Sequence, residues 1–151
     1  MLRVLLTGLS ISLMTASAPA MEKTSTLQPI ELASCGEADS ECLEYRTKVE
    51  HDFPQALNGD YRAMWTVAIG MANGLGVSQN MVGSCTWASL AIMTGDTRVD
   101  DNAVAMAKNG CAKLDTAGLL AARQQFDGLA PKALKSPSAV FPFSPGILAR
   151  P

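Results

Sequence analysis

The residues that begin and end helices constrain the fold of this chain more than any other feature of its sequence. Aspartate, asparagine and serine side chains accept hydrogen bonds from the free N–H groups of a first helical turn, and glycine takes the left-handed backbone that commonly ends a helix. Between such signals apolar residues recur at helical spacing, and no stretch alternates in the manner of a strand. The pattern predicts five helices and no sheet, at residues 40–52, 61–73, 81–94, 100–108 and 115–126.

The boundaries of these predicted helices follow from the same signals. Pro54 lacks a backbone N–H, so we expect it to disrupt or end the first helix. Gly59, Gly110 and Gly128 are expected to mark the ends of the first, fourth and fifth helices. Gly74-Leu75-Gly76 has no following Lys-Ser or Lys-Thr and no preceding strand, so a short loop joining two antiparallel helices is favoured over a phosphate-binding loop.

The N-terminus has the pattern of a secretory signal peptide. A single basic residue, Arg3, precedes an apolar run over residues 4–14, and small residues lead up to an expected cleavage after Ala20. A membrane-spanning helix needs roughly 20 apolar residues, more than this run supplies. A lipidation signal ending at Cys35 is disfavoured because the polar residues 22–31 separate it from the apolar run. We therefore expect a periplasmic or secreted bacterial protein without a membrane-spanning segment once the signal is removed.

Four cysteines in an exported protein predict two disulfides. Three pairings of Cys35, Cys42, Cys85 and Cys111 are possible, and Cys35–Cys42 with Cys85–Cys111 is favoured because each pair is close in the chain or on adjacent helical units. Seven residues within one helix would hold the Cα atoms of Cys35 and Cys42 about 10 Å apart, which is too far for a disulfide. The first helix should therefore begin after Cys35.

Composition and length narrow the class of protein. The 151 residues are 48% hydrophobic, which predicts a single folded domain, and 12 basic against 14 acidic residues give no electrostatic signature of nucleic-acid binding. We divide the chain into a signal peptide (1–20), a polar leader (21–38), a helical domain (39–128) and a proline-rich tail (129–151).

The tail is predicted to be extended or disordered. Five of the eight prolines and three basic residues lie in it, with no acidic residue. Its apolar segment Val140-Phe141-Pro142-Phe143 is expected either to occupy a groove on its own helical body or to reach a partner, the alternative being a disordered extension.

Residues 63–95 resemble a Sel-one-like repeat, a relative of the tetratricopeptide repeat. The matching positions, in chain order, are Ala63, Val67, Ala68, Met71, Gly74, Gly76, Val77, Asn80, Ser84, Trp87, Ala91, Ile92 and Gly95. Four of them depart mildly from the family pattern, since Ala68 stands for glycine, Met71 for tyrosine, Asn80 for aspartate and Ser84 for alanine. The resemblance implies an all-α array of helical hairpins, in which stacked neighbours bury the apolar faces that one hairpin leaves open.

The resemblance also implies a function in protein binding. Exported proteins of this family act as adaptors or regulators in envelope signalling and host contact, and they bind through the concave face of the array. Candidate contact residues are Tyr61, Arg62 and Trp65 in the repeat, and Phe141 and Phe143 in the tail. We expect a protein partner.

Catalytic and metal-binding patterns are missing from the sequence. No serine has lysine three residues on, no G-x-S-x-G occurs, and the single histidine, His51, is expected on a solvated helix face between Glu50 and Asp52. We therefore expect no catalytic residue, cofactor or metal. Two alternatives stay open, a small envelope hydrolase or peptidoglycan-binding factor and a purely structural, disulfide-stapled envelope protein.

Overall fold

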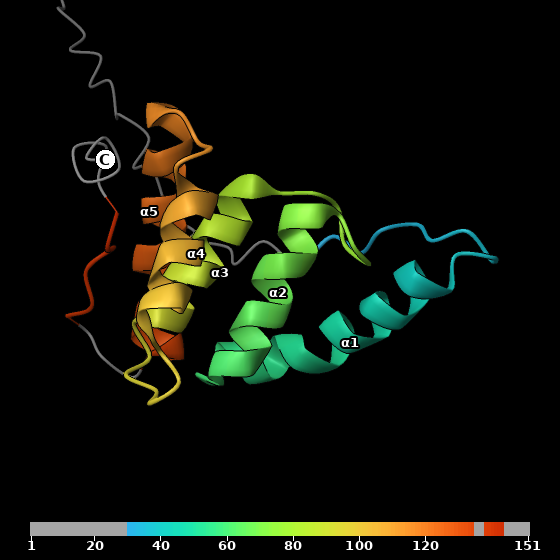
Figure 1. Ribbon diagram of the computed structural model, residues 1–151, viewed down its shortest axis with the longest axis horizontal. Helices are drawn as coiled ribbons and strands as arrows, with labels where there is room; N and C mark the ends of the chain where they lie inside the picture. The colour runs from blue at the N-terminus through green and yellow to red at the C-terminus, as the bar shows by residue number, and fades with distance from the viewer. Residues whose placement is uncertain (1–29, 135–137, 144–151) are drawn as a thin grey trace, which may run out of the picture.

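The computed structural model describes residues 30–134 and 138–143, and this part of the chain is all-helical (Figure 1). It contains five helices, α1 (Ser40–Leu57), α2 (Tyr61–Asn73), α3 (Met81–Ile92), α4 (Asp101–Cys111) and α5 (Thr116–Ala133). The predicted all-α class with five helices is confirmed. The predicted signal peptide, the first half of the leader (21–29) and residues 135–137 and 144–151 of the tail lie outside the described residues.

Every one of these helices begins at a side-chain cap. In each case a carboxylate or amide oxygen accepts a hydrogen bond from the backbone N–H three residues further on, at 2.8 to 3.0 Å. The capping residues are Asp39, Asp60, Asn80, Asp100 and Asp115. Four of these five capping residues are aspartates, so helix capping accounts for the placement of their carboxylates.

Three helices extend beyond their predicted ends. α1 continues through Pro54 to Leu57, α4 continues through Gly110 to Cys111, and α5 continues through Gly128 and Pro131 to Ala133. A proline inside a helix removes one backbone hydrogen bond, at a cost of about 3 kcal/mol. Ala56 and Ala133 after these prolines are buried, and Leu57 and Leu134 pack against the core, so burial counters part of that cost.

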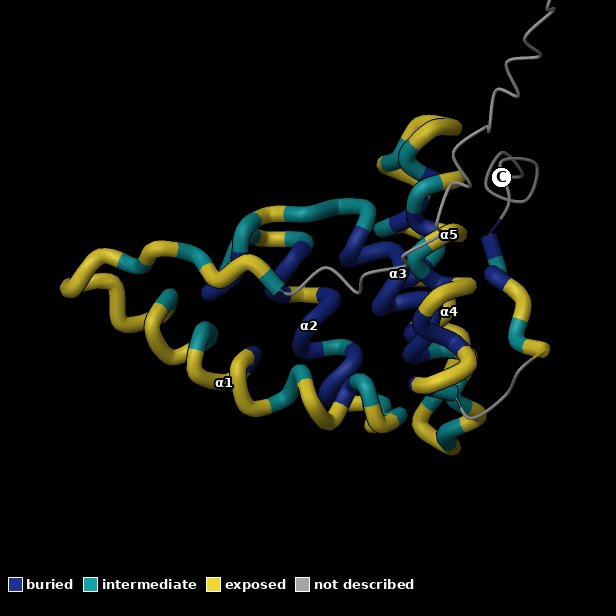
Figure 2. The backbone as a smooth tube through the Cα atoms, turned by 180° about the vertical axis from the view of Figure 1, so that it is seen from behind, coloured by how far each residue is buried: buried dark blue, intermediate teal, exposed yellow. Residues whose placement is uncertain are grey.

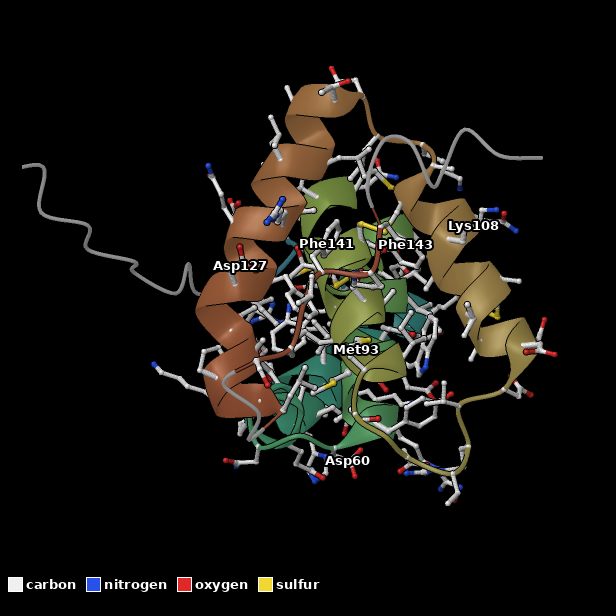
Figure 3. The ribbon with its side chains drawn as sticks, turned by 90° about the vertical axis from the view of Figure 1, so that its left-hand side faces the viewer. Asp60, Met93, Lys108, Asp127, Phe141 and Phe143 are labelled. Atoms are coloured by element: carbon white, nitrogen blue, oxygen red, sulfur yellow. A yellow bond between two sulfur atoms is a disulfide. The ribbon has the colours of Figure 1, made fainter. Side chains whose placement is uncertain are left out.

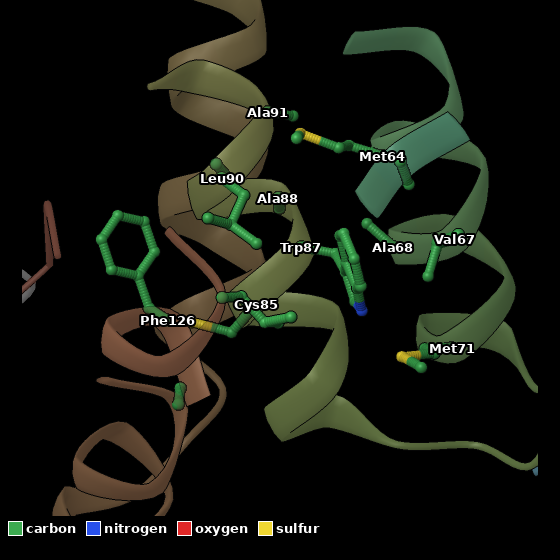
Figure 4. Packing of buried hydrophobic residues seen from close by; sticks show 14 of the residues in the cluster. Met64, Val67, Ala68, Met71, Cys85, Trp87, Ala88, Leu90, Ala91 and Phe126 are labelled. Carbon is green, nitrogen blue, oxygen red and sulfur yellow. The ribbon is translucent and has the colours of Figure 1, made fainter. Parts of the chain in front are cut away.

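α3 lies at the centre of the helical packing. α2 packs against α1 on one side and α3 on the other, and α3 also contacts α4 and α5 (Figure 1). Trp87 of α3 faces α2 across this core (Figure 4), and its ring lies edge-on to Phe53 of α1 at 5.7 Å between centroids. As a result, α1 is exposed along its outer side, whereas α2 and α3 are buried over most of their length (Figure 2).

The loop between α2 and α3 is fixed from two sides. Gly76 has φ +67°, and a Cβ atom there would lie 2.3 Å from the backbone nitrogen of Arg46 in α1. On the other side the leader forms a short bridge, in which Ala33 N–H donates to Gly76 O at 3.1 Å and Ser78 N–H donates to Glu31 O at 2.8 Å. The glycine loop is thus a packing element between α1 and the leader.

Both disulfides have the pairing that the sequence favours. Cys35–Cys42 ties the leader to the first turn of α1 across 5.6 Å between Cα atoms, and Cys85–Cys111 joins α3 to α4 across 4.9 Å. α1 begins after Cys35, as the spacing argument requires.

The described part of the tail is packed against the body. Phe141 and Phe143 are 8% and 6% exposed and belong to the main hydrophobic core. Of the outcomes expected for this segment, the structure has the one in which the tail occupies its own helical body.

Candidate functional site

A groove lies between α2 and the start of α4. Its volume is about 280 Å³, and α2 supplies one wall while α4 and the turn before it supply the other. The lining residues are Tyr61, Trp65, Ile69, Arg98, Asp100, Asn102, Ala103 and Met106.

The α2 wall is a single stripe of large side chains. Tyr61, Trp65 and Ile69 are four residues apart, so they lie above one another on the same helix face. The rings of Tyr61 and Trp65 meet edge to face, with centroids 6.4 Å apart. The indole N–H of Trp65 is shielded from solvent and has no hydrogen-bond acceptor among the described residues. A buried N–H without an acceptor costs about 1–3 kcal/mol.

An arginine held by an ion pair closes one end of the groove. Arg98 Nη2 lies 2.6 Å from Asp96 Oδ2, and the Arg98 guanidinium carbon lies 4.9 Å from the centre of the Tyr61 ring. The Tyr61 hydroxyl donates to the Arg98 carbonyl oxygen at 3.4 Å. Hydrogen bonds from the side chain and the backbone N–H of Arg98 lower the pKa of Asp96 to about 2. The carboxylate is thus ionised at neutral pH and orients the arginine toward the tyrosine.

The remaining lining of the groove mixes apolar side chains that are open to solvent with the polar residues Asp100 and Asn102. Ile69 on α2 and Met106 on α4 are 36% and 49% exposed. Beside Met106, the side chain of Asn102 lies one turn earlier on α4 and reaches the methionine sulfur at 3.9 Å. The site thus combines two aromatic rings, two exposed apolar side chains and an arginine.

Comparison with family models, with curated proteins and with solved structures gives no match to this chain. The Sel-one-like assignment therefore stays a prediction that rests on residues 63–95.

The predicted contact residues fall in three places. Tyr61 and Trp65 line the groove, whereas Arg62 is exposed on α2 outside the lining, where its charge contributes slightly to lowering the pKa of Asp96. Phe141 and Phe143 lie on another face, against α5.

Sequence reasoning missed the contribution of α4 and the turn before it. Arg98, Asn102 and Met106 carry no motif, and only the fold places them opposite α2. One signal was present, because Asn102 and Met106 are four residues apart and thus share a face of the predicted helix.

The single histidine lies away from this groove. His51 Nδ1 is 2.9 Å from Asp52 Oδ1, and the imidazole is largely exposed on α1 as expected. Within residues 30–134 and 138–143, no three histidine, cysteine, aspartate or glutamate residues are grouped so as to hold a metal ion. In the same part of the chain no helix has the length and apolar character needed to cross a membrane.

Proposed function

We propose that this chain is an exported protein-interaction module of the Sel-one-like kind, and that it binds a partner polypeptide in the groove between α2 and α4. The groove itself is the observation that carries the proposal. It exposes apolar side chains beside two aromatic rings, and contiguous exposed apolar surface commonly marks an interaction site.

The open shape of the groove favours side chains of a polypeptide over a whole small molecule. Pockets for drug-sized ligands enclose most of the surface of the ligand. A groove of about 280 Å³ with open access accommodates one or two protruding side chains of a partner. Methionine adapts its shape to such residues, and tyrosine and tryptophan offer large contact areas with few rotatable bonds.

The position of the groove also supports a hairpin-array module. In such arrays the first helices of successive hairpins line the concave face, which is the face used for binding. If α2–α3 is one hairpin, α4 begins the next, and the groove lies between the two first helices.

Export is the second part of the proposal. Two disulfides fit an oxidising compartment, because thiols are kept reduced in the cytosol of most organisms. The N-terminal pattern agrees with a bacterial periplasmic or secreted location.

Site-specific photo-cross-linking tests the binding site directly. A photoreactive residue is placed at Met106 in the groove or, as a matched control, at Leu120, which is 54% exposed on α5 and not part of the groove lining. We expect the Met106 probe, in the full chain expressed with its N-terminal segment, to capture a discrete envelope protein that the Leu120 probe does not capture. The variant Met106→Glu should weaken binding of that protein at least tenfold, while Leu120→Glu should not.

Two results would contradict the proposal. Capture of the same proteins from both positions would mean that the groove is not selective. A blank at Met106 together with cell-wall binding or hydrolysis by the purified oxidised chain would favour the envelope-enzyme alternative.

A further inference from the structure

The tail segment 138–143 lies on the helical body as a ligand would. Figure 3 shows Phe141 and Phe143 side by side on a non-helical segment that runs between α4 and α5. The ring of Phe141 meets Phe126 of α5 edge-on at 5.6 Å between centroids, and the ring of Phe143 meets Phe141 at 6.1 Å. We call the α5 surface around Phe126 that these two rings cover the aromatic seat.

The sequence of the segment restricts its conformation. Pro142 fixes its own φ and disfavours helical conformation at Phe141, and the backbone bends at Pro142. Phe141 and Phe143, on either side of this proline, are buried, while Val140 is 69% exposed. The segment thus presents two aromatic side chains, two positions apart, to the helical body.

The helical body does not depend on the segment for its hydrogen bonding. α5 completes its last turn on its own, since the Leu134 N–H donates to Ala130 O at 2.9 Å. α5 also contacts α3 independently of the tail, since the buried Thr86 hydroxyl lies 3.2 Å from Ala122 O and Gln125 Oε1, besides 2.9 Å from Val82 O of its own helix. The described hydrogen bonds between α5 and α3 therefore do not involve the segment.

We propose that the aromatic seat is a second peptide-binding site, for a segment of another protein that carries two phenylalanines two residues apart. The chain's own tail segment occupies this site, and such a ligand displaces it. A segment tethered by a short linker has an effective concentration on the order of millimolar. The tail segment therefore excludes weak ligands, and only a partner segment that binds the aromatic seat more tightly than the tail does can displace it.

The test uses the full chain in which the aromatic rings of Phe141 and Phe143 have been removed by substitution. In Phe141→Ala/Phe143→Ala the seat is vacated, and the synthetic peptide Ser-Ala-Val-Phe-Pro-Phe, which repeats residues 138–143, is titrated against it by calorimetry. We expect this variant to bind the peptide at least tenfold more tightly than the wild-type chain does. A peptide with both phenylalanines replaced by alanine should not bind.

Two controls keep the outcome interpretable. Val140→Ala alters an exposed residue of the same segment and should behave as wild type. If circular dichroism shows that the double variant is unfolded, Phe143→Ala alone takes its place, with the same expected gain in peptide affinity. Equal peptide affinity for variant and wild type, or absence of binding to a folded variant, would overturn the proposal and leave the tail as ordinary core.

This inference is independent of the groove between α2 and α4. Met106→Glu should leave peptide binding at the aromatic seat unchanged, so failure at one site is distinguishable from failure at the other.

Discussion

Removing the disulfide between α3 and α4 should destabilise the protein more than removing the one between the leader and α1. The two bonds close loops of different length, with sequence separations of 26 for Cys85–Cys111 and 7 for Cys35–Cys42. Loop-closure entropy in the unfolded chain then gives about 3.5 kcal/mol for the first and about 2.4 kcal/mol for the second. Burial adds to the difference, since Cys85 and Cys111 are core residues and their replacement by alanine leaves a cavity.

Guanidinium and thermal unfolding of Cys85→Ala/Cys111→Ala and Cys35→Ala/Cys42→Ala, each against wild type, measure these costs. At about 4 °C per kcal/mol, the loss in Tm should be about 14 °C for the first variant and about 10 °C for the second. The m-value has to be compared as well, because a cross-link also alters the compactness of the unfolded chain.

The ordering of the two losses is the decisive result. Equal losses, or a larger loss for the partly buried pair Cys35–Cys42, would show that loop length and burial do not govern stability here. The size of the combined effect also bears on location. About 6 kcal/mol is comparable to the whole stability of a small domain, about 5–15 kcal/mol, so the reduced chain should be only marginally folded. Expression in a reducing cytosol should then yield less folded protein than export does.

Two further predictions concern the loop and the ion pair. Gly76→Ala should lower the free energy of unfolding, measured with denaturant, by about 3 kcal/mol or more, because its Cβ would meet the Arg46 backbone. Gly95→Ala is the matched control, since Gly95 has the same left-handed conformation (φ +72°) but open space around it. It should lower the free energy of unfolding by only about 1 kcal/mol. The pKa of Asp96 is lowered from 3.8 to about 2 by hydrogen bonds from Arg98, so its contribution to stability is present above about pH 4 and is lost as pH falls through about 2. The Tm of Asp96→Asn should accordingly lie below that of wild type above pH 4 and converge with it near pH 2, and a pH-independent difference would contradict this role.

Local signals in the sequence were sufficient to predict the five helices and the pairing of the disulfides. A capping residue acts on backbone groups three residues away, so Asp60 and Asp115 could be interpreted without knowledge of the fold. The disulfide pairing followed from chain proximity and helix geometry. The ends at Pro54 and Gly128 were wrong because burial of the residues that follow, which only the tertiary structure determines, offsets the local preference for stopping.

The candidate groove was predictable on one wall only. Tyr61 and Trp65 are one helical turn apart, so their shared face could be inferred from spacing. The opposite wall depends on how the turn after α3 places α4 beside α2. Arg98 lies in that turn, which has no periodic pattern, and its orientation comes from Asp96 and from contact with the Tyr61 ring.

The two binding sites that we propose differ in what a ligand must displace, and this difference makes them separable in the wild-type chain. At the groove, Ile69 and Met106 are already exposed, so a partner replaces only solvent and binding should not depend on the tail. At the aromatic seat, a partner competes with two buried phenylalanines at a high local concentration. A ligand whose affinity rises when Phe141 and Phe143 are replaced by alanine therefore binds at the seat, and one whose affinity is unchanged by that replacement but falls in Met106→Glu binds in the groove.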